Sequence, residues 1–181
     1  MTDQKRVFKS GNEGAAWAAE EIDLYRSEGL LTTKMIPAEG EHSAAGICYG
    51  ASTGGRVINA TSANGLLYAL EQLPVQSGTR YPMVLNVACR TVSGPLSIKG
   101  DHSDIMYALN CGWLIFYAMD NQQVYDFNIV GLKVAEEVSL PVIIAYDGFF
   151  TSHQKKPMFV FENDSDVKEY LGEYKSKYSL F

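Results

Sequence analysis

The sequence predicts a doubly wound α/β fold, in which a mainly parallel sheet carries helices on both faces. Strand-like and helix-like segments alternate along the chain with short connections, as in sheets built from right-handed crossovers. Segment 83–88 is continuously apolar, which indicates a strand covered on both faces. The polar clusters follow predicted strands, so we expect them at the carboxyl edge of the sheet, where open α/β sheets bind ligands.

The first third of the chain predicts a helix, a strand and a second helix. Ser10 or Asn12 can cap a helix that continues through an alanine-rich stretch to Gly29. Residues 31–36 then predict a short strand, and the alanines and glycines of 43–52 suit a helix that lies close to the sheet.

The middle of the chain repeats this pattern. We expect a β-branched strand at 56–60, a turn at 61–65 and a helix at 66–73 that ends at Pro74. A buried strand at 82–89 follows, and then a loop that bears glycine and serine.

The last third predicts further alternation. Asp101 and Ser103 can cap a helix at 105–110. The elements expected after it are a strand at 113–118, a long helix at 121–138, a strand at 140–146, a loop at 147–153, a strand-like piece at 158–161 and an amphipathic helix at 164–177.

Composition restricts the class of protein. With 181 residues, of which 46% are hydrophobic and 20% charged, the chain suits one globular domain with a full core and room for a tail. Its net charge of −6, without a basic patch, argues against nucleic acid as a partner. No apolar run approaches the ~18–20 residues of a membrane span, and residues 1–10 are too polar for a secretory signal. We therefore expect a cytoplasmic protein.

The cysteines and histidines do not define a metal site. The cysteines are Cys48, Cys89 and Cys111. They are odd in number and widely spaced, which predicts reduced, buried thiols rather than ligands of zinc or an iron–sulfur cluster. The histidines, His42, His102 and His153, all fall in loops after strands. Because their neighbours suit hydrogen bonding as well as metal binding, no metal is assigned.

Two charged positions stand out at the presumed ligand edge. Glu41, with Glu39 beside it, lies where the strand at 31–36 gives way to the next helix. These acids either belong to a ligand site or only complement the helix N-terminus, an effect of about 0.3–1 kcal/mol. Arg90 directly follows a buried strand, so it either meets a carboxylate of the protein or receives an anionic ligand.

The chain has no G-x-G-x-x-G, Walker A, G-x-S-x-G or H-E-x-x-H motif. It does carry an ordered series of other motifs: Gly11 to Glu13, Glu39 to Gly46, Thr61 to Leu66, Ala88 to Thr91, Leu96 to Asp104 and Tyr146 to His153. Together these resemble the pyrimidine-binding domain of the 2-oxoacid:ferredoxin oxidoreductases. These thiamine-diphosphate enzymes include the pyruvate, oxalate and phenylglyoxylate oxidoreductases.

The resemblance implies roles for particular residues. Glu41 matches the glutamate that hydrogen-bonds N1′ of the aminopyrimidine, where a carboxylate promotes the imino tautomer that deprotonates the thiazolium C2. Ser62 and Asn64 fall in the motif expected beside the cofactor. Arg90 matches the arginine that holds the substrate carboxylate.

The loop at 91–101, with Gly94 and Asp101, resembles the segment that borders the substrate. Segments 40–42 and 70–73 favour the oxalate and phenylglyoxylate branch slightly over the pyruvate branch.

One departure from the family concerns residues 19–20. Family members have, between the first two helices, a strand that ends in a Tyr-Pro-x-Thr-Pro-like loop, and nothing here matches it. The resemblance then implies two helices joined at Ala19-Glu20, with a strand and loop missing. Either a natural deletion removed this wall of the active site, or the sequence omits an internal segment. Its end at Leu180-Phe181, where family chains continue into another domain, favours part of a longer subunit.

We therefore expect residues 1–155 to form a thiamine-diphosphate pyrimidine-binding domain and 156–181 to form a tail and helix leading toward a further domain. The expected activity is oxidative decarboxylation of a 2-oxoacid, to an acyl-CoA or CO₂, by a subunit or fragment of a hetero-oligomer. Electrons would pass to ferredoxin or another acceptor through iron–sulfur clusters on other chains. A partner would supply the diphosphate and Mg²⁺ half of the site, because no Gly-Asp-Gly…Asn run occurs here.

Two alternatives remain open. One is a degenerate subunit that only supports assembly. The other is a flavodoxin-like regulator, which would need a nucleotide or an acidic phospho-acceptor cluster at the same edge.

Overall fold

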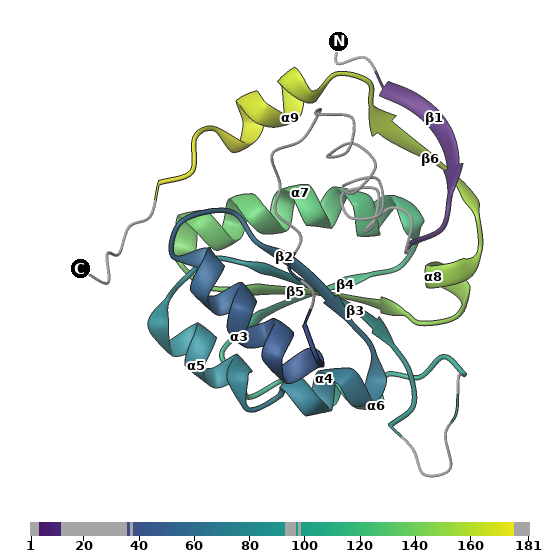
Figure 1. Ribbon diagram of the computed structural model, residues 1–181. Coiled ribbons are helices and arrows are strands. Elements are labelled where there is room, and N and C mark those ends of the chain that lie inside the picture. Colours follow the sequence, from purple (N-terminus) through teal and green to yellow (C-terminus); the bar gives the residue numbers. More distant parts are fainter. Residues whose placement is uncertain (1–3, 12–35, 37, 93–96, 98, 176–181) are drawn as a thin grey trace.

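The computed structural model confirms the predicted doubly wound α/β architecture and describes residues 4–11, 36, 38–92, 97 and 99–175 (Figure 1). Its centre is a sheet of four parallel strands in the order β2–β3–β5–β4. The strands are β2 (Ile58–Thr61), β3 (Val84–Cys89), β4 (Leu114–Ala118) and β5 (Val142–Asp147). Because all four run the same way, their carboxyl ends share one edge, as predicted.

Helices cover both faces of this sheet, because right-handed crossovers change face when the strand order reverses. The helices of one face are α3 (Glu41–Ser52), α4 (Ala63–Ala69), α5 (Gln72–Thr79) and α6 (Ser103–Met106), and α7 (Asn121–Val138) covers the other (Figure 1). Side chains of the central strands alternate between the two. Leu85 and Ile143 pack with the first group of helices, and Val84 and Ile144 pack with α7.

Two predicted helices have different bounds in the structure. The helix expected at 66–73 is α4, which begins and ends earlier, and Pro74 lies in the first turn of α5 instead of ending a helix. Proline is tolerated there because the first N–H groups of a helix have no partner within it. The helix expected at 105–110 is α6, which begins at Ser103 and ends at Met106. Its N-cap is His102, and neither Asp101 nor Ser103 caps it.

Some predicted features lie outside the described residues. They are the helix at 12–29 with its junction at 19–20, the strand at 31–36 except for Ile36, and the centre of the loop at 91–100, including Gly94. The loop expected at 147–153 contains a short helix, α8 (Phe150–His153).

A two-stranded antiparallel ribbon lies beyond α7, and the sequence predicted only half of it. β6 (Lys156–Phe161) pairs with β1 (Gln4–Lys9), which was not predicted as a strand. The side chain of Gln122 on α7 bonds both the N–H and the carbonyl of Phe159, so α7 meets the other edge of β6. The ribbon thus joins the first described residues to the segment predicted as a tail.

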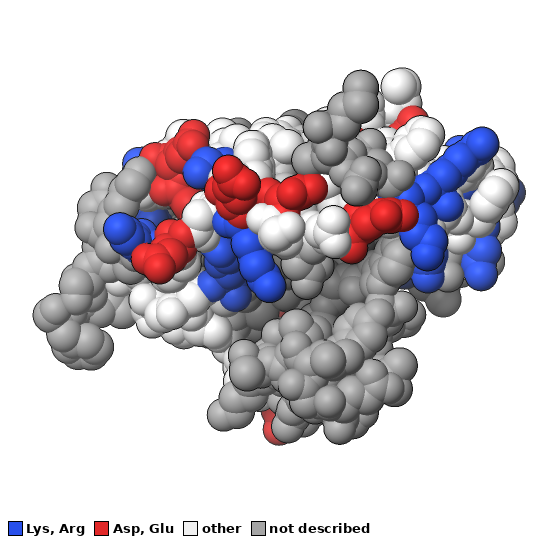
Figure 2. Space-filling model, turned by 90° about the horizontal axis from the view of Figure 1, so that it is seen from above, with Lys and Arg blue, Asp and Glu red and all other residues white. Residues whose placement is uncertain are grey.

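The ribbon also gathers charge that is dispersed along the sequence. The basic residues of its two strands are Lys5, Arg6, Lys9 and Lys156, and neither strand contains an acid. Figure 2 shows basic side chains grouped over this end of the molecule and mixed with acidic ones elsewhere on the same face. The expectation of no basic patch was therefore wrong, because it considered only residues close in sequence.

The last helix, α9 (Asp164–Leu171), is held from two directions. The Arg56 side chain bonds both carboxylate oxygens of Glu136 on α7, at 2.6 and 3.1 Å, and also reaches the carbonyls of Leu171 and Gly172. The Tyr174 hydroxyl donates to the carbonyl of Ser52 at the end of α3. In the part of the chain that the structure describes, no helix is both long enough and apolar enough to cross a membrane.

Candidate functional site

Glu41 is the first residue of α3, at the carboxyl edge of the sheet. Its side chain is exposed, and it lies across the first turn of α4. A Cβ atom added to Gly65 would stand only 2.7 Å from the Glu41 Oε1 atom and 2.9 Å from its Cγ. Glycine at position 65 therefore provides the space that the glutamate occupies.

The hydroxyl of Thr61, at the end of β2, shares this space. The same added Cβ would lie 2.7 Å from Thr61 Oγ1, so Gly65 separates this hydroxyl from the carboxylate of Glu41. Thr61 Oγ1 is buried and has no hydrogen-bond partner among the described residues, which costs about 1–3 kcal/mol for a polar atom. An exposed carboxylate and a buried hydroxyl thus lie side by side.

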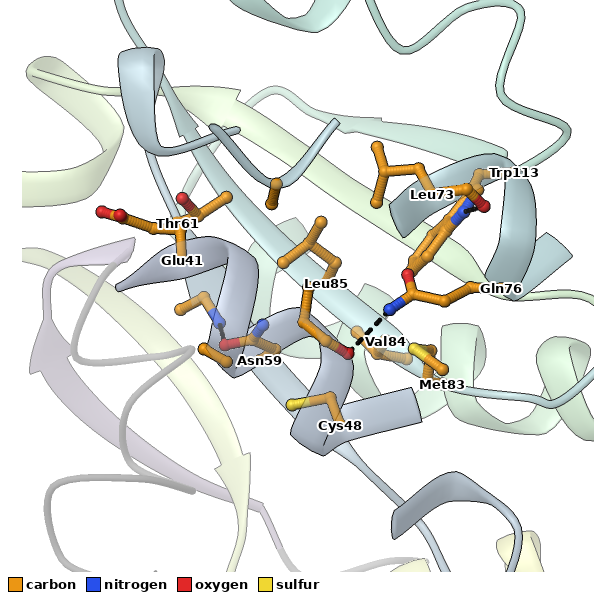
Figure 3. A pocket seen from close by; sticks show the side chains of 14 residues that line it. Glu41, Cys48, Asn59, Thr61, Leu73, Gln76, Met83, Val84, Leu85 and Trp113 are labelled. Carbon is orange, nitrogen blue, oxygen red and sulfur yellow. Dashed lines mark hydrogen bonds between the residues drawn. The ribbon is translucent and has the colours of Figure 1, made fainter. Parts of the chain in front are cut away.

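A small cavity extends beneath α3 from this point (Figure 3). Its volume is about 30 Å³, and its walls are mostly apolar side chains from α3, α5 and the central strands. Gln76 crosses it to donate to the carbonyl of Ala45 at 2.8 Å. A cavity of this size holds about one or two water molecules, so it is too small for an organic ligand. Any ligand that reaches Glu41 must approach from the exposed edge.

Arg90 is the first residue after β3, and it points toward the start of α4. Its Nε donates to the Ser62 hydroxyl at 2.6 Å. Ser62 is the N-cap residue of α4, but its side chain does not cap that helix and accepts from the arginine instead. Among the described residues, no carboxylate lies within ion-pair distance of the Arg90 guanidinium. The ion pair with a protein carboxylate, one of the two alternatives for Arg90, is thus not seen there.

Asp104 connects the start of α4 to the residue that follows β3. Its carboxylate is completely buried and accepts three backbone hydrogen bonds. Oδ2 accepts from Ala63 N at 3.0 Å and from Arg90 N at 2.9 Å, and Oδ1 accepts from Ile105 N at 2.8 Å. The end of β3 and the start of α4 therefore meet on one oxygen atom.

The Asp101 carboxylate is occupied within its own loop. It accepts from the backbone N–H of His102 and from the Ser103 hydroxyl, and these bonds hold the pKa of Asp101 below its usual range. Ser103 in turn accepts from Val92 N at 3.1 Å, which closes the loop on itself. The carboxylate of Asp101 thus orders this loop, and its predicted contact with substrate stays a prediction.

A thiol and a phenol lie on the same edge behind Arg90. Burial, and then the negative charge of Asp104, raises the pKa of Cys89 to about 12, so its thiol stays protonated at neutral pH. Burial, with Cys89 next in importance, also raises the pKa of Tyr117, whose hydroxyl is hydrogen-bonded to His102 Nδ1.

The three thiols are free; Cys89 and Cys111 are buried, as predicted, whereas Cys48 is only half-buried. Within the described ranges, no group of three or more His, Cys, Asp or Glu residues is arranged to hold a metal ion.

The structure brings together three of the residues predicted from the sequence. Glu41, Ser62 and Arg90 surround the first turn of α4, and Asn64 is exposed on that same turn. Sequence reasoning gave Thr61 and Gly65 no role beyond their place in a motif at the ligand edge, and it did not predict the backbone hydrogen bonds of Asp104. A glycine in the first turn of a helix was the available signal for a close approach, but the contacts of Asp104 depend on the crossovers and have no sequence signal.

Known proteins resemble this chain over most of its length. The family model described as "Pyruvate flavodoxin/ferredoxin oxidoreductase, thiamine diP-bdg" matches residues 15–180. The pyruvate synthase subunit PorA of Thermotoga maritima is 42% identical over 157 residues, which cover 85% of this chain and 40% of that relative. The ketoisovalerate oxidoreductase subunit VorA of Pyrococcus abyssi is 38% identical over 203 residues, covering 99% of this chain and 51% of that relative.

A solved structure has the same fold. It is the 2-oxoglutarate:ferredoxin oxidoreductase from Magnetococcus marinus with 2-oxoglutarate, coenzyme A and succinyl-CoA bound. The TM-score is 0.74 at 19% identity, over 89% of this chain and 32% of that chain. The chain therefore spans about half, or less, of the length of these relatives.

Proposed function

This chain belongs to the thiamine-diphosphate-binding family of pyruvate flavodoxin/ferredoxin oxidoreductases, and we propose that it supplies the pyrimidine half of a cofactor site in a 2-oxoacid oxidoreductase. The observation that carries this proposal is the exposed Glu41 carboxylate, which lies against Gly65 on the first turn of α4. The exposed carboxylate fits a ring that presents a hydrogen-bonding nitrogen to this edge.

Glu41 would hold a proton at N1′ of the aminopyrimidine, with Ser62 and Asn64 on the adjoining turn. When bound, thiamine diphosphate supplies the electron sink needed for 2-oxoacid decarboxylation. The chain's own part is to place one carboxylate at the edge where the ring binds. The small cavity under α3 leaves no room for the ring beneath that carboxylate.

Arg90 would receive the carboxylate of the substrate. Its Nε is engaged by Ser62, which orients the guanidinium, and no described carboxylate competes for it. A planar guanidinium binds a carboxylate with two parallel hydrogen bonds, which fixes the orientation of the substrate as well as its position. We place Gly94 and Asp101 in the loop that borders this substrate.

The remaining parts of the reaction would belong to other polypeptides or segments. Mg²⁺ and the cofactor diphosphate, the iron–sulfur clusters, and the contact with ferredoxin or a similar acceptor fall in this group, and coenzyme A is a further candidate ligand of the assembly. The predicted division at residue 155, the cytoplasmic location and the preference for the oxalate and phenylglyoxylate branch stay predictions. The relatives named above are pyruvate and ketoisovalerate enzymes.

The test is a substrate screen on the assembled native complex. Pyruvate, a branched-chain 2-oxoacid, 2-oxoglutarate, oxalate and an aromatic 2-oxoacid are each supplied with thiamine diphosphate, Mg²⁺, coenzyme A and a viologen acceptor. We expect cofactor-dependent reduction of the viologen with one class of 2-oxoacid. A correctly assembled complex that reduces viologen with none of them would support the alternative, a degenerate subunit that serves assembly only.

A further inference from the structure

We propose that Asp104 is a positioning residue for Arg90, acting through the backbone of both walls of the substrate site. This inference rests on the proposed function, because it assigns Arg90 to the substrate carboxylate. It concerns a residue that touches neither substrate nor cofactor. The juxtaposition that carries it is one buried oxygen, Asp104 Oδ2, shared by the amides of Ala63 and Arg90.

The burial of Asp104 indicates a built feature and not a chance contact. Taking a carboxylate out of water is costly unless it is well hydrogen-bonded. Asp104 is 0% exposed, and three backbone nitrogens lie within 3.0 Å of its carboxylate oxygens and donate to them. The two residues held by Oδ2 are separated along the chain by α4, α5 and β3. Paired strands β2 and β3 bring these two segments side by side, and Asp104 joins them just beyond the end of that pairing.

The backbone of Ala63 shows what this contact holds in place. Ala63 has a φ of 44°, in the left-handed region that residues with a Cβ rarely adopt. Such a conformation persists only where the surroundings impose it, and it clusters at functional sites. The hydrogen bond from Ala63 N to Asp104 supplies that constraint at the residue that follows Ser62.

Arg90 is thereby held at two points. Its backbone N–H is bound to Asp104, and its Nε is bound to Ser62, the neighbour of Ala63. A shift of either segment would move the guanidinium relative to the first turn of α4, against which the Glu41 side chain of α3 lies. We infer that Asp104 sets the distance between the group that receives the substrate carboxylate and the group that serves the cofactor.

The test uses the assembled complex with Asp104→Ala, Asp104→Asn and Arg90→Ala, alone and combined, and pyruvate or the best substrate of the screen. Asp104→Ala should lower kcat/KM at least about tenfold, mainly through KM, and Asp104→Asn less, because its single acceptor oxygen can keep part of the contact. When Asp104→Ala is already present, adding Arg90→Ala should lower kcat/KM by less than about threefold, since the arginine is already misplaced. If Arg90→Ala keeps its full penalty there, the proposal is overturned.

Two further variants separate positioning from stability. Ala63→Gly removes the steric cost of the left-handed backbone, so it should raise the melting temperature of Asp104→Ala without restoring KM. Ser77→Ala removes a buried hydrogen bond to the Cys111 carbonyl, remote from the site, and should lower the melting temperature with KM unchanged. Recovery of KM by Ala63→Gly would show that Asp104 matters only for stability, and would overturn the proposal.

Hydrogen exchange provides a readout that does not need turnover. Peptides covering residues 62–65 and 90–92 should exchange faster in Asp104→Ala than in the parent or in Ser77→Ala. Unchanged exchange in both segments would overturn the proposal even in an active enzyme. If the parent complex turns over no 2-oxoacid, the proposed function fails by itself, and faster exchange in both segments would still establish that Asp104 anchors them.

Discussion

At the scale of single residues, Gly65 is as informative as the glutamate beside it. We expect Gly65→Ala to displace the side chains of Glu41 and Thr61, because the new methyl group would lie within 3 Å of both. Both can rotate away and alanine favours a helix, so the melting temperature should change little while the KM for thiamine diphosphate rises about tenfold or more. Gly46→Ala on α3, whose methyl group would meet nothing within 4 Å, is the matched control. Equal effects of the two variants would contradict this prediction.

Glu41→Gln tests the chemistry of the carboxylate without changing its shape. The amide cannot hold a proton on N1′, so we expect turnover to fall on the order of 10²-fold or more. Glu41 is exposed, and so the unfolding temperature should be unaffected. Turnover of the assembled mutant at the parental rate would remove Glu41 from the mechanism.

Arg90→Ala should raise KM for the 2-oxoacid and lower turnover. A charge-assisted pair of this kind contributes roughly 1.5–3 kcal/mol, or about 10- to 150-fold in kcat/KM. Arg90→Lys should recover only part of this, because an ammonium supplies charge without the planar fork. Steady-state kinetics and melting temperature are measured on the same preparation. A destabilised but kinetically normal Arg90→Ala would assign the arginine to structure alone.

At the scale of secondary structure, Arg56 links the end of α9 to α7. Arg56→Ala leaves Glu136 without this partner and removes the donor to the carbonyls of Leu171 and Gly172, so we expect the free energy of unfolding to fall by about 1.5–3 kcal/mol. Lys175→Ala, which removes an exposed cation from the same region, should stay within about 0.5 kcal/mol. Urea denaturation measures the free energy of unfolding of both variants. Similar losses in the two would show that the contacts of Arg56 do not stabilise this part of the molecule.

The elements that the sequence predicted well are those with local signals. α7 has its predicted bounds, Asn121–Val138, because Asp120 caps its first turn and Ser139 adopts a left-handed conformation (φ 54°) at its end. Pro74 misled the prediction of α4 and α5, since proline suits the first turn of a helix as well as the residue after one. β1 was missed because its partner, β6, lies at the opposite end of the described chain.

The site likewise contains residues that a sequence signal predicted and residues that only the folded structure brings together. Glu41 lies at this edge, although the strand predicted before it falls outside the described residues. The position of Arg90 was predictable, because parallel strands bring the residues that follow them to one edge. The role of Asp104 was not, because its two amide partners are brought together only by the folded crossovers. The predicted substrate role of Asp101 rests on the resemblance, and the structure gives its carboxylate local partners.

At the scale of the whole molecule, the site is open on one side. We expect this chain alone to bind thiamine diphosphate weakly, because the edge around Glu41 offers few contacts and the cavity beside it is too small for a ring. Titration calorimetry on the isolated chain, with and without Mg²⁺, should give no micromolar binding, whereas the assembled complex should bind. Micromolar, Mg²⁺-dependent binding by the chain alone would contradict a cofactor site shared between subunits.

The ribbon of β1 and β6 has a consequence for the order of folding. Each parallel pair of the central sheet joins segments separated by a single crossover or two, whereas the ribbon pairs Gln4 with Phe161. Closing a longer loop costs more entropy, and contacts of high sequence separation slow folding. We therefore expect the central sheet to assemble first and the ribbon, with α9 beside it, to form last and open first. The face that carries the basic residues can then loosen and re-form while the edge that carries Glu41 and Arg90 stays intact.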